Sequence, residues 1–387
     1  MIGVDAPARR LRAGLDIGGT KILGVVIDDS PEEGVQSIWR SESGETVRQI
    51  DRNPPVGEST AAAAGPRIVA TVRVPSGSGP DAVLDSAHAV LRALAEQCGI
   101  RTDEFASVGV GIPGTVDPPT GVVRQALNLG IEHLDLAADL RARIGREGHV
   151  ESDVNAAAVG AAAVGGAVHG GAVRSQAGGA SLAYLNLGTG LAAGLVLDGA
   201  LWRGAGGAAG EIGHVPIDPL GPLCPCGQRG CIEVMASGSG IQRQWGGEPA
   251  PNAARMLDLA AGGDQKATEI VDRLVLAVAS AVRLLVLTAD VDVVAIGGGL
   301  AGGFGETLLS SVRTRLREWQ AASPFLASLD PAGRVVAVPR ERPIAAIGAA
   351  LAAPIVPVPA LVTHDLTHAA GAIDAAPITT TLIAPAV

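Results

Sequence analysis

Three cysteines and a histidine lie close together in the sequence and are residue types that bind transition metals. Cys224, Cys226 and Cys231 fall in the segment CPCGQRGC, and His214 lies a short distance upstream. A structural zinc ion takes four such ligands in a tetrahedron, which leaves no open position for catalysis. A disulfide would leave one of the three cysteines unpaired, and it suits an exported protein. The pattern therefore favours a structural zinc site.

A glycine-rich turn near the start of the chain has the composition of a phosphate-binding turn. The segment LDIGGTKILGVVID at residues 15–28 predicts a strand, a tight turn and a second strand. Turn glycines let backbone N–H groups approach phosphate oxygens, and a hydroxyl, an ammonium and a carboxylate that holds Mg²⁺ through water can assist them. The residues concerned are Asp16, Gly18, Gly19, Thr20 and Lys21. Alone, the segment is equally compatible with an ordinary β-turn.

The same pattern recurs in LNLGTGLAAGLVLD at residues 185–198. The identical pairs are Leu15/Leu185, Gly18/Gly188, Gly24/Gly194, Val26/Val196 and Asp28/Asp198. A repeat with so long a period indicates duplicated domains. We therefore predict that two hairpins hold one polyphosphate and that a third glycine-rich turn lets a nucleoside lie against the backbone. The added candidates are Gly188, Thr189 and Gly190 in the second hairpin, and Gly297, Gly298 and Gly299 in the third turn.

Carboxylates next to these segments could act on a hydroxylated substrate. Asp153, in ESDVN, stands where a strand gives way to an alanine-rich helix, a place where helix capping alone would favour it. In a cleft facing a phosphate site, the same carboxylate could accept a hydroxyl proton. Glu211, His214 and Glu233 flank the cysteines and could bind sugar hydroxyls, although their spacing alone leaves this open.

The elements that must position these residues alternate between strands and helices, which favours a layered α/β fold. We expect strands at 107–112 and 291–296 and helices at 81–98, 153–164 and within 252–289. Segments 29–65 and 165–179 are expected to be an insertion and a linker, and the tail from 354 to be disordered. The uncharged run 344–362 is broken by prolines, so it predicts a short buried helix followed by an irregular tail rather than a membrane span.

Composition limits the class of protein. With 387 residues, of which 47% are hydrophobic, the chain can form two domains with substantial cores. The net charge of −10 gives no global patch for nucleic acid. Residues 1–14 contain no signal peptide and Arg283 interrupts the apolar run 274–289, so we expect a cytoplasmic protein without membrane or nucleic-acid partners.

Together these segments resemble the ROK family (repressors, open reading frames and kinases) of the actin-like ATPase superfamily. The matching motifs are LDIGGTK at 15–21, GVGIPGTVD at 109–117, NLG at 128–130, ESDVNAAAVG at 151–160, LGTG at 187–190, GAAGEIGH at 207–214, CPCGQRGCIE at 224–233 and AIGGGL at 295–300. The resemblance implies two actin-like (ribonuclease H-like) ATPase domains with an interdomain cleft. It predicts an N-terminal extension, two domains and a tail at 1–13, 14–150, 151–353 and 354–387, with a zinc loop at 214–231. The family's kinases use ATP and Mg²⁺ to phosphorylate hexoses or N-acylated hexosamines and are often homodimers or homotetramers.

The resemblance also implies residue roles. Asp153 is the expected general base, and Glu211, His214 and Glu233 are expected to bind sugar, with His214 also bound to zinc through its second ring nitrogen. Gly114 and Asn128 are expected to line the same pocket. The chain departs from the family at Ser152, where a sugar-contacting Asn is usual, at Ala161, where Glu is common, and at Ala192, where Gly is common.

We predict a glucokinase-type enzyme that converts glucose to glucose 6-phosphate. N-acetylglucosamine, mannose, fructose and allose kinases share most of these motifs. Ser152 and Ala161 motivate a second hypothesis, a sugar-binding pseudokinase. A repressor of the same family is the third, but residues 1–14 are too few for its DNA-binding domain.

Overall fold

Two five-stranded sheets with the same strand order form the framework of the described chain. The computed structural model describes residues 10–30, 66–168 and 181–355. The first sheet runs β3 (Arg67–Pro75), β2 (Lys21–Asp28), β1 (Leu11–Ile17), β4 (Ser107–Ile112) and β8 (Gly148–Ser152). The second runs β11 (Ala200–Trp202), β10 (Leu191–Leu197), β9 (Leu182–Leu187), β12 (Val293–Gly297) and β13 (Val335–Ala337). In each sheet the first hairpin is antiparallel and the following strands join it in parallel, so the predicted duplication extends to topology.

Two helices at corresponding places in the chain link the sheets. Helix α3 (Asp153–Val168) follows β8 but packs on β9 and β10, whereas α10 (Ile344–Ala352) follows β13 but packs on β1 and β4. The helices cross closely, because a Cβ on Gly160 would lie 1.9 Å from Ile344 O and one on Gly348 would lie 1.7 Å from Ala156 O. Glycine at both positions is therefore required for this packing.

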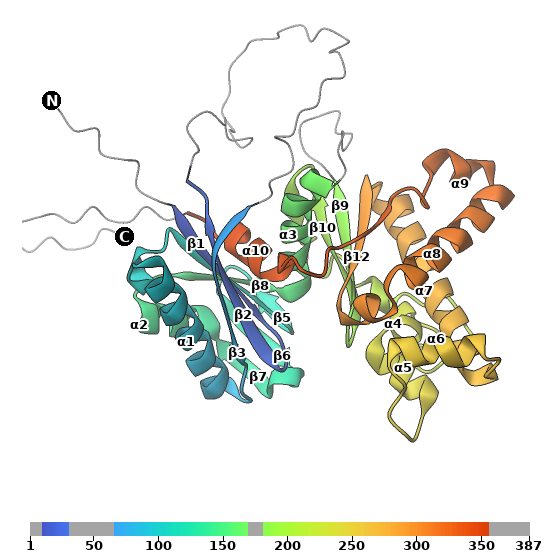
Figure 1. Cartoon of the computed structure of the whole chain (residues 1–387), viewed down its shortest axis with the longest axis horizontal. Coiled ribbons are helices and arrows are strands. Elements are labelled where there is room, and N and C mark those ends of the chain that lie inside the picture. Colours follow the sequence, from blue (N-terminus) through green and yellow to red (C-terminus); the bar gives the residue numbers. More distant parts are fainter. Residues whose placement is uncertain (1–9, 31–65, 169–180, 356–387) are drawn as a thin grey trace, which may run out of the picture. The chain divides into compact units, whose positions relative to one another are not determined.

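The remaining elements cover the sheets and carry loops. A small sheet contains β5 (Thr115–Asp117), β6 (Val122–Ala126) and β7 (Ile131–Asp135), and short 3₁₀ turns occupy Thr102–Glu104, Leu127–Leu129 and Ile212–His214. The helices are α1 (Pro80–Cys98), α2 (Leu136–Ile144), α4 (Ile232–Ala236), α5 (Gly238–Trp245), α6 (Ala253–Ala261), α7 (Gln265–Ala289), α8 (Gly299–Ala322) and α9 (Pro324–Leu329). Figure 1 labels most of them.

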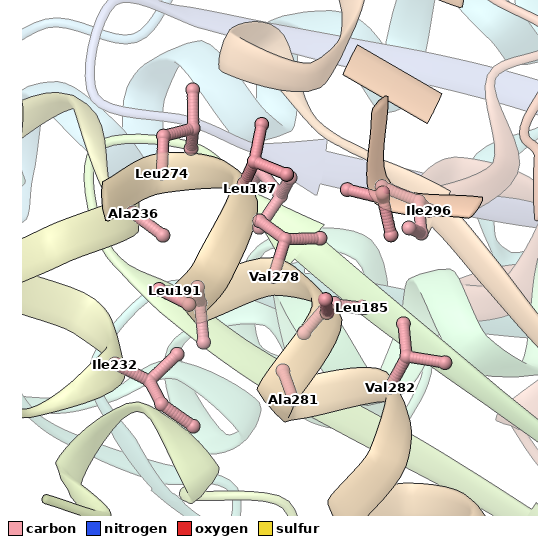
Figure 2. Packing of buried hydrophobic residues seen from close by; sticks show 14 of the residues in the cluster. Leu185, Leu187, Leu191, Ile232, Ala236, Leu274, Val278, Ala281, Val282 and Ile296 are labelled. Carbon is pink, nitrogen blue, oxygen red and sulfur yellow. The ribbon is translucent and has the colours of Figure 1, made fainter. Parts of the chain in front are cut away.

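Helix α7 supplies one side of the larger apolar core. Its periodic residues Leu274, Val278 and Val282 are buried together with Leu185 of β9 and Ile296 of β12 (Figure 2). At roughly 25 cal/mol for each Å² of apolar surface removed from water, such side chains contribute about 1.5–3 kcal/mol each. Arg283 of the same helix lies over the Trp319 ring at 4.4 Å from its centroid. Among the helices described, none combines the length and the apolar character needed to cross a bilayer.

Most predicted elements are confirmed, with small shifts. The helix expected at 81–98 spans Pro80–Cys98, and the strand expected at 291–296 spans Val293–Gly297. The expected linker at 165–179 is wrong in its first part, since α3 continues to Val168 despite two glycines, and 169–180 lie outside the described residues. The insertion at 29–65 and the tail from 354 also lie almost entirely outside them. Cys98, at the end of α1, is half-buried.

Candidate active site

One cavity of about 800 Å³ gathers most of the candidate site residues. It is lined by both hairpin turns, the end of β8, the start of α3 and the loop that follows β11. The predicted residues on its wall are Gly18, Gly19, Gly114, Asn128, Ser152, Asp153, Gly188, Thr189, Gly190, Glu211, His214 and Glu233. Residues far apart in the sequence therefore face a single space large enough for a small substrate.

Asp153, on the wall of this cavity, and Asp16 are neighbouring carboxylates. Both line a second cavity of about 240 Å³, together with Gly298. Burial raises the pKa of Asp16 to about 6, with the Asp153 charge adding to the effect and Lys21 opposing it. Burial also raises the pKa of Asp153, and the charge of Glu211 raises it further, although the Val154 N–H donates to Asp153 Oδ1 at 2.9 Å and opposes this. Carboxylates with raised pKa values in a cleft can exchange protons near neutral pH.

The two hairpin turns are held by different neighbours. In the first, Ser76 Oγ donates to Gly18 O at 2.6 Å and the Ser76 N–H donates to Thr20 O at 3.3 Å. In the second, Glu233 Oε2 accepts the Leu191 N–H at 3.1 Å, while the N–H groups of the segment after α4 donate to the turn carbonyls. Each turn thereby keeps its shape before any ligand binds.

The 3₁₀ turn at Ile212–His214 positions two of the candidate sugar-binding residues, Glu211 and His214. The His214 N–H donates to Glu211 O at 3.3 Å, and both side chains are exposed on the cavity wall. Glu233 stands near the start of α4 and also contacts the second hairpin, as just described. Three polar side chains from two neighbouring segments thus converge, an arrangement suited to the hydroxyl groups of a small polar ligand.

The cysteine loop brings its sulfur atoms to metal-binding separations. The ligand atoms of His214, Cys224 and Cys226 all lie within 4.8 Å of one another. The Sγ atoms of Cys226 and Cys231 are 3.7 Å apart, against about 3.8 Å for two thiolates at 2.3 Å from a tetrahedral zinc. None of these cysteines forms a disulfide. Burial raises the pKa of Cys231 to about 12, so a bound cation would be needed to make this thiol a thiolate near neutral pH. Cys231 is not part of that three-residue group, so three of the four predicted ligands lie together and the fourth lies beside Cys226. The residue types fit zinc.

Several predicted residues lie away from the main cavity. Thr20, Lys21, Gly297 and Gly299 are not among the residues that line it, and Asp16 and Gly298 line only the smaller one. Gly298 has φ of 95°, and a Cβ there would lie 2.5 Å from Leu187 O, so its glycine is required by the turn before α8. Lys21 is exposed at the start of β2.

Further polar residues line the larger cavity and were not predicted from the sequence. Glu151, Asn155, Asn186 and Arg203 all line it. Glu151 and Asn155 stand inside the motif ESDVN, and Asn186 stands inside the second hairpin segment, but none of the three was predicted to belong to the site. Arg203 stands outside every motif, and a basic residue just ahead of a glycine-rich loop was the only signal that could have pointed to it.

Comparison with known proteins points to the same family that the sequence motifs resemble. The model of the ROK family matches residues 64–353, which is most of the chain. The chain belongs to the ROK family. A glucokinase of Thermotoga maritima is 32% identical over 280 residues, 67% of this chain and 84% of the relative. An N-acetylmannosamine kinase of Vibrio cholerae serotype O1 is 33% identical over 213 residues, 54% of this chain and 70% of the relative.

The fold agrees with this membership. The crystal structure of a ROK family glucokinase from Streptomyces griseus, in complex with glucose and AMPPNP, superposes with a TM-score of 0.60 at 27% identity and covers 89% of this chain and 99% of that one. This ROK protein therefore has the two-domain actin-like fold, and the two sheets of equal strand order are the cores of those domains.

Proposed function

We propose that this chain, a sugar kinase of the ROK family, transfers the γ-phosphoryl group of ATP to a hydroxyl of a hexose, with glucose as the first candidate. The observation that carries the proposal is the position of Asp153. Asp153 lies on the wall of the larger cavity, which both glycine hairpin turns and the polar residues Glu211, His214 and Glu233 also line. The glucokinase of Thermotoga maritima supports glucose as the acceptor.

Asp153 would act as the general base. One of its oxygens, Oδ1, accepts the Val154 N–H, which fixes the orientation of the carboxylate. The sugar O–H bond breaks as its proton passes to Asp153, the sugar oxygen forms a bond to the γ-phosphorus, and the bond from that phosphorus to the bridging oxygen of ADP breaks. The raised pKa of Asp153 makes it a better proton acceptor once ionised.

The remaining polar residues would bind and orient the two substrates. Glu211, His214 and Glu233 would hold ring hydroxyls so that one hydroxyl faces Asp153, and the backbone N–H groups of the two hairpins would hold the triphosphate. Asp16 would hold magnesium through water, because it stands in β1 directly ahead of the first hairpin turn. Bound magnesium would supply positive charge to the transferring phosphates.

The cysteine loop would hold zinc as a structural ion. His214, Cys224, Cys226 and Cys231 complete four ligands, so no position stays open for substrate. The ion would fix the His214 ring through one nitrogen and leave the other for a sugar hydroxyl. It would also hold the loop that leads into α4, where Glu233 stands.

A sugar panel tests the enzymatic proposal. Purified protein is assayed with ATP and magnesium by coupled ADP detection against glucose, mannose, fructose, allose, N-acetylglucosamine and N-acetylmannosamine. We expect the highest kcat/KM with glucose. Measurable sugar binding without turnover of any sugar would instead establish the pseudokinase, and a higher kcat/KM for an N-acylated sugar would replace glucose as the substrate.

Metal analysis tests the zinc proposal. We expect one zinc per chain in the wild-type protein and loss of that zinc in Cys226→Ser, with weakened sugar binding. Cys98→Ser is the matched control, because Cys98 lies at the end of α1 away from the loop. Absence of zinc from wild-type protein that still binds sugar would contradict the proposal that a structural zinc ion supports the sugar pocket.

A further inference from the structure

A buried ion pair connects the strand that carries the candidate base to the loop that carries the candidate sugar ligands. Arg203, just after β11, donates from Nε and Nη2 to Glu151 Oε2 at 2.8 and 2.5 Å. The Glu151 side chain is 2% exposed and that of Arg203 is 35% exposed, on the wall of the larger cavity. Removal of the cationic partner would destabilise the fold around Glu151, because it would leave a buried charge unpaired.

The hydrogen bonds of Glu151 hold it rigidly beside Asp153. Its second oxygen, Oε1, accepts the Ser152 N–H at 3.2 Å and Asn155 Nδ2 at 3.0 Å. His149 Nε2 is 3.9 Å from Oε2, and burial lowers the pKa of this histidine, which favours its neutral form. Arg203 therefore supplies the neutralising charge. Because Glu151 sits two positions ahead of Asp153, its anchor also fixes the start of α3.

The loop that Arg203 begins has few other anchors before it reaches Glu211. The Ala209 N–H donates to Arg203 O at 3.2 Å, and Gly210 O accepts the Ala193 N–H at 2.8 Å. Between them, a Cβ on Gly206 or Gly207 would meet nothing within 4 Å, so this stretch makes little packing contact. The guanidinium is thus the main tie between the first half of the loop and the first sheet.

We propose that the Glu151–Arg203 ion pair is a strap that sets the distance between Asp153 and the sugar-binding loop 203–214, so that Arg203 is a positioning residue for the acceptor sugar. The strap joins β8 to the loop after β11, and Asp153, Arg203 and Glu211 all line the same cavity. A misplacement of about 1 Å at a reacting centre can cost about 10²-fold in rate. The proposal rests on the sugar-kinase function given above.

Steady-state kinetics of Arg203→Met, Arg203→Lys, Glu151→Gln and the double variant test the strap. We expect Arg203→Met to lower kcat/KM for the sugar by about 10²-fold, with the KM for ATP nearly unchanged, and Arg203→Lys to recover part of the loss. The double variant should be no worse than the poorer single variant, because both remove one interaction. Arg313→Met is the matched control, since it breaks an ion pair with Glu306 on α8, far from the cavity lining.

The outcomes separate the strap from a general loss of stability. Sugar kcat/KM within about twofold of wild type in a folded Arg203→Met protein would overturn it, as would equal losses for sugar and ATP that follow the melting temperature. If Arg203→Met does not fold, Arg203→Lys and Glu151→Gln decide by the same sugar-to-ATP contrast. Failure of the wild type on every sugar would sink the kinase proposal alone, and the strap would then be read from sugar dissociation constants measured by calorimetry.

Discussion

The two sheets share a strand order but differ in the chemistry at corresponding places. The first hairpin carries Asp16 ahead of its turn, whereas the second carries Asn186 at the matching position. The helix after the fifth strand begins with Asp153 in one half and with Ile344 in the other. The duplicated scaffold thus provides two similar frames, and only the first carries carboxylates at these two matching positions.

This asymmetry has a physical reason. The Asp153 charge already raises the pKa of Asp16, and a further carboxylate at position 186, which lines the same cavity, would add like-charge repulsion. An amide at Asn186 keeps hydrogen-bonding capacity without charge, and its Oδ1 accepts the Tyr184 hydroxyl at 3.3 Å. The second half contributes Glu211, His214 and Glu233 to the wall of the larger cavity.

The largest expected effect comes from removing the carboxylate of Asp153, which has no counterpart at the start of α10. Asp153→Asn should lower kcat by about 10³-fold, because general-base catalysis contributes about 10²–10⁴-fold. Sugar binding, measured by calorimetry, should change little, since the amide fills the same space. Asp258→Asn, an exposed position on α6, is the control. Turnover close to wild type would exclude Asp153 as the base.

The next prediction concerns Asp16→Asn, which gives the first hairpin the amide that the second hairpin has at Asn186. Folding raises the pKa of Asp16 from 3.8 to about 6, so its ionisation opposes folding at higher pH. Asp16→Asn should therefore raise the free energy of unfolding by up to about 3 kcal/mol at pH 8. The gain should shrink as the pH falls through 6 and should vanish only well below 3.8, where the carboxyl is protonated in both states. Turnover should fall at the same time.

Urea unfolding at pH 5 and pH 8, without added nucleotide or magnesium, checks this prediction. Asp258→Asn again serves as the control, because it removes an exposed carboxylate and leaves Asp16 in place. A stability gain for Asp16→Asn that is equal at both pH values would contradict the assigned cause. A loss of stability at pH 8 would mean that the carboxylate makes favourable contacts that outweigh its burial.

The sequence predicted what depends on local pattern. Both hairpins follow from β-branched runs around glycine turns, and the cysteine loop follows from spacing within one segment. The crossing of α10 to the first sheet and the pairing of Arg203 with Glu151 depend on how distant segments meet, which spacing does not encode. The continuation of α3 to Val168 was missed because a run of Gly and Ala has the same composition as a linker.

A smaller effect is expected where the two linking helices cross. Gly348→Ala should lower stability by about 1–3 kcal/mol, because overpacking forces the helices apart when a Cβ would lie 1.7 Å from Ala156 O. Thermal unfolding measures this. Gly262→Ala at the end of α6 is the control, since φ there is −78° and the nearest atom to an added Cβ is 3.2 Å away. Equal stability for both variants would mean that the crossing is looser than described.

The smallest effect concerns the residue just ahead of the candidate base. Ser152 Oγ accepts the Asn155 N–H at 3.2 Å and so caps α3, a role that Asn fills equally well. Ser152→Asn, which restores the residue usual in the family, should therefore leave stability unchanged and lower the sugar KM by about fivefold, the value of about one neutral hydrogen bond. Ser152→Ala should instead cost about 1 kcal/mol of stability through loss of the cap. An unchanged KM in the Asn variant would show that position 152 serves α3 and not the sugar.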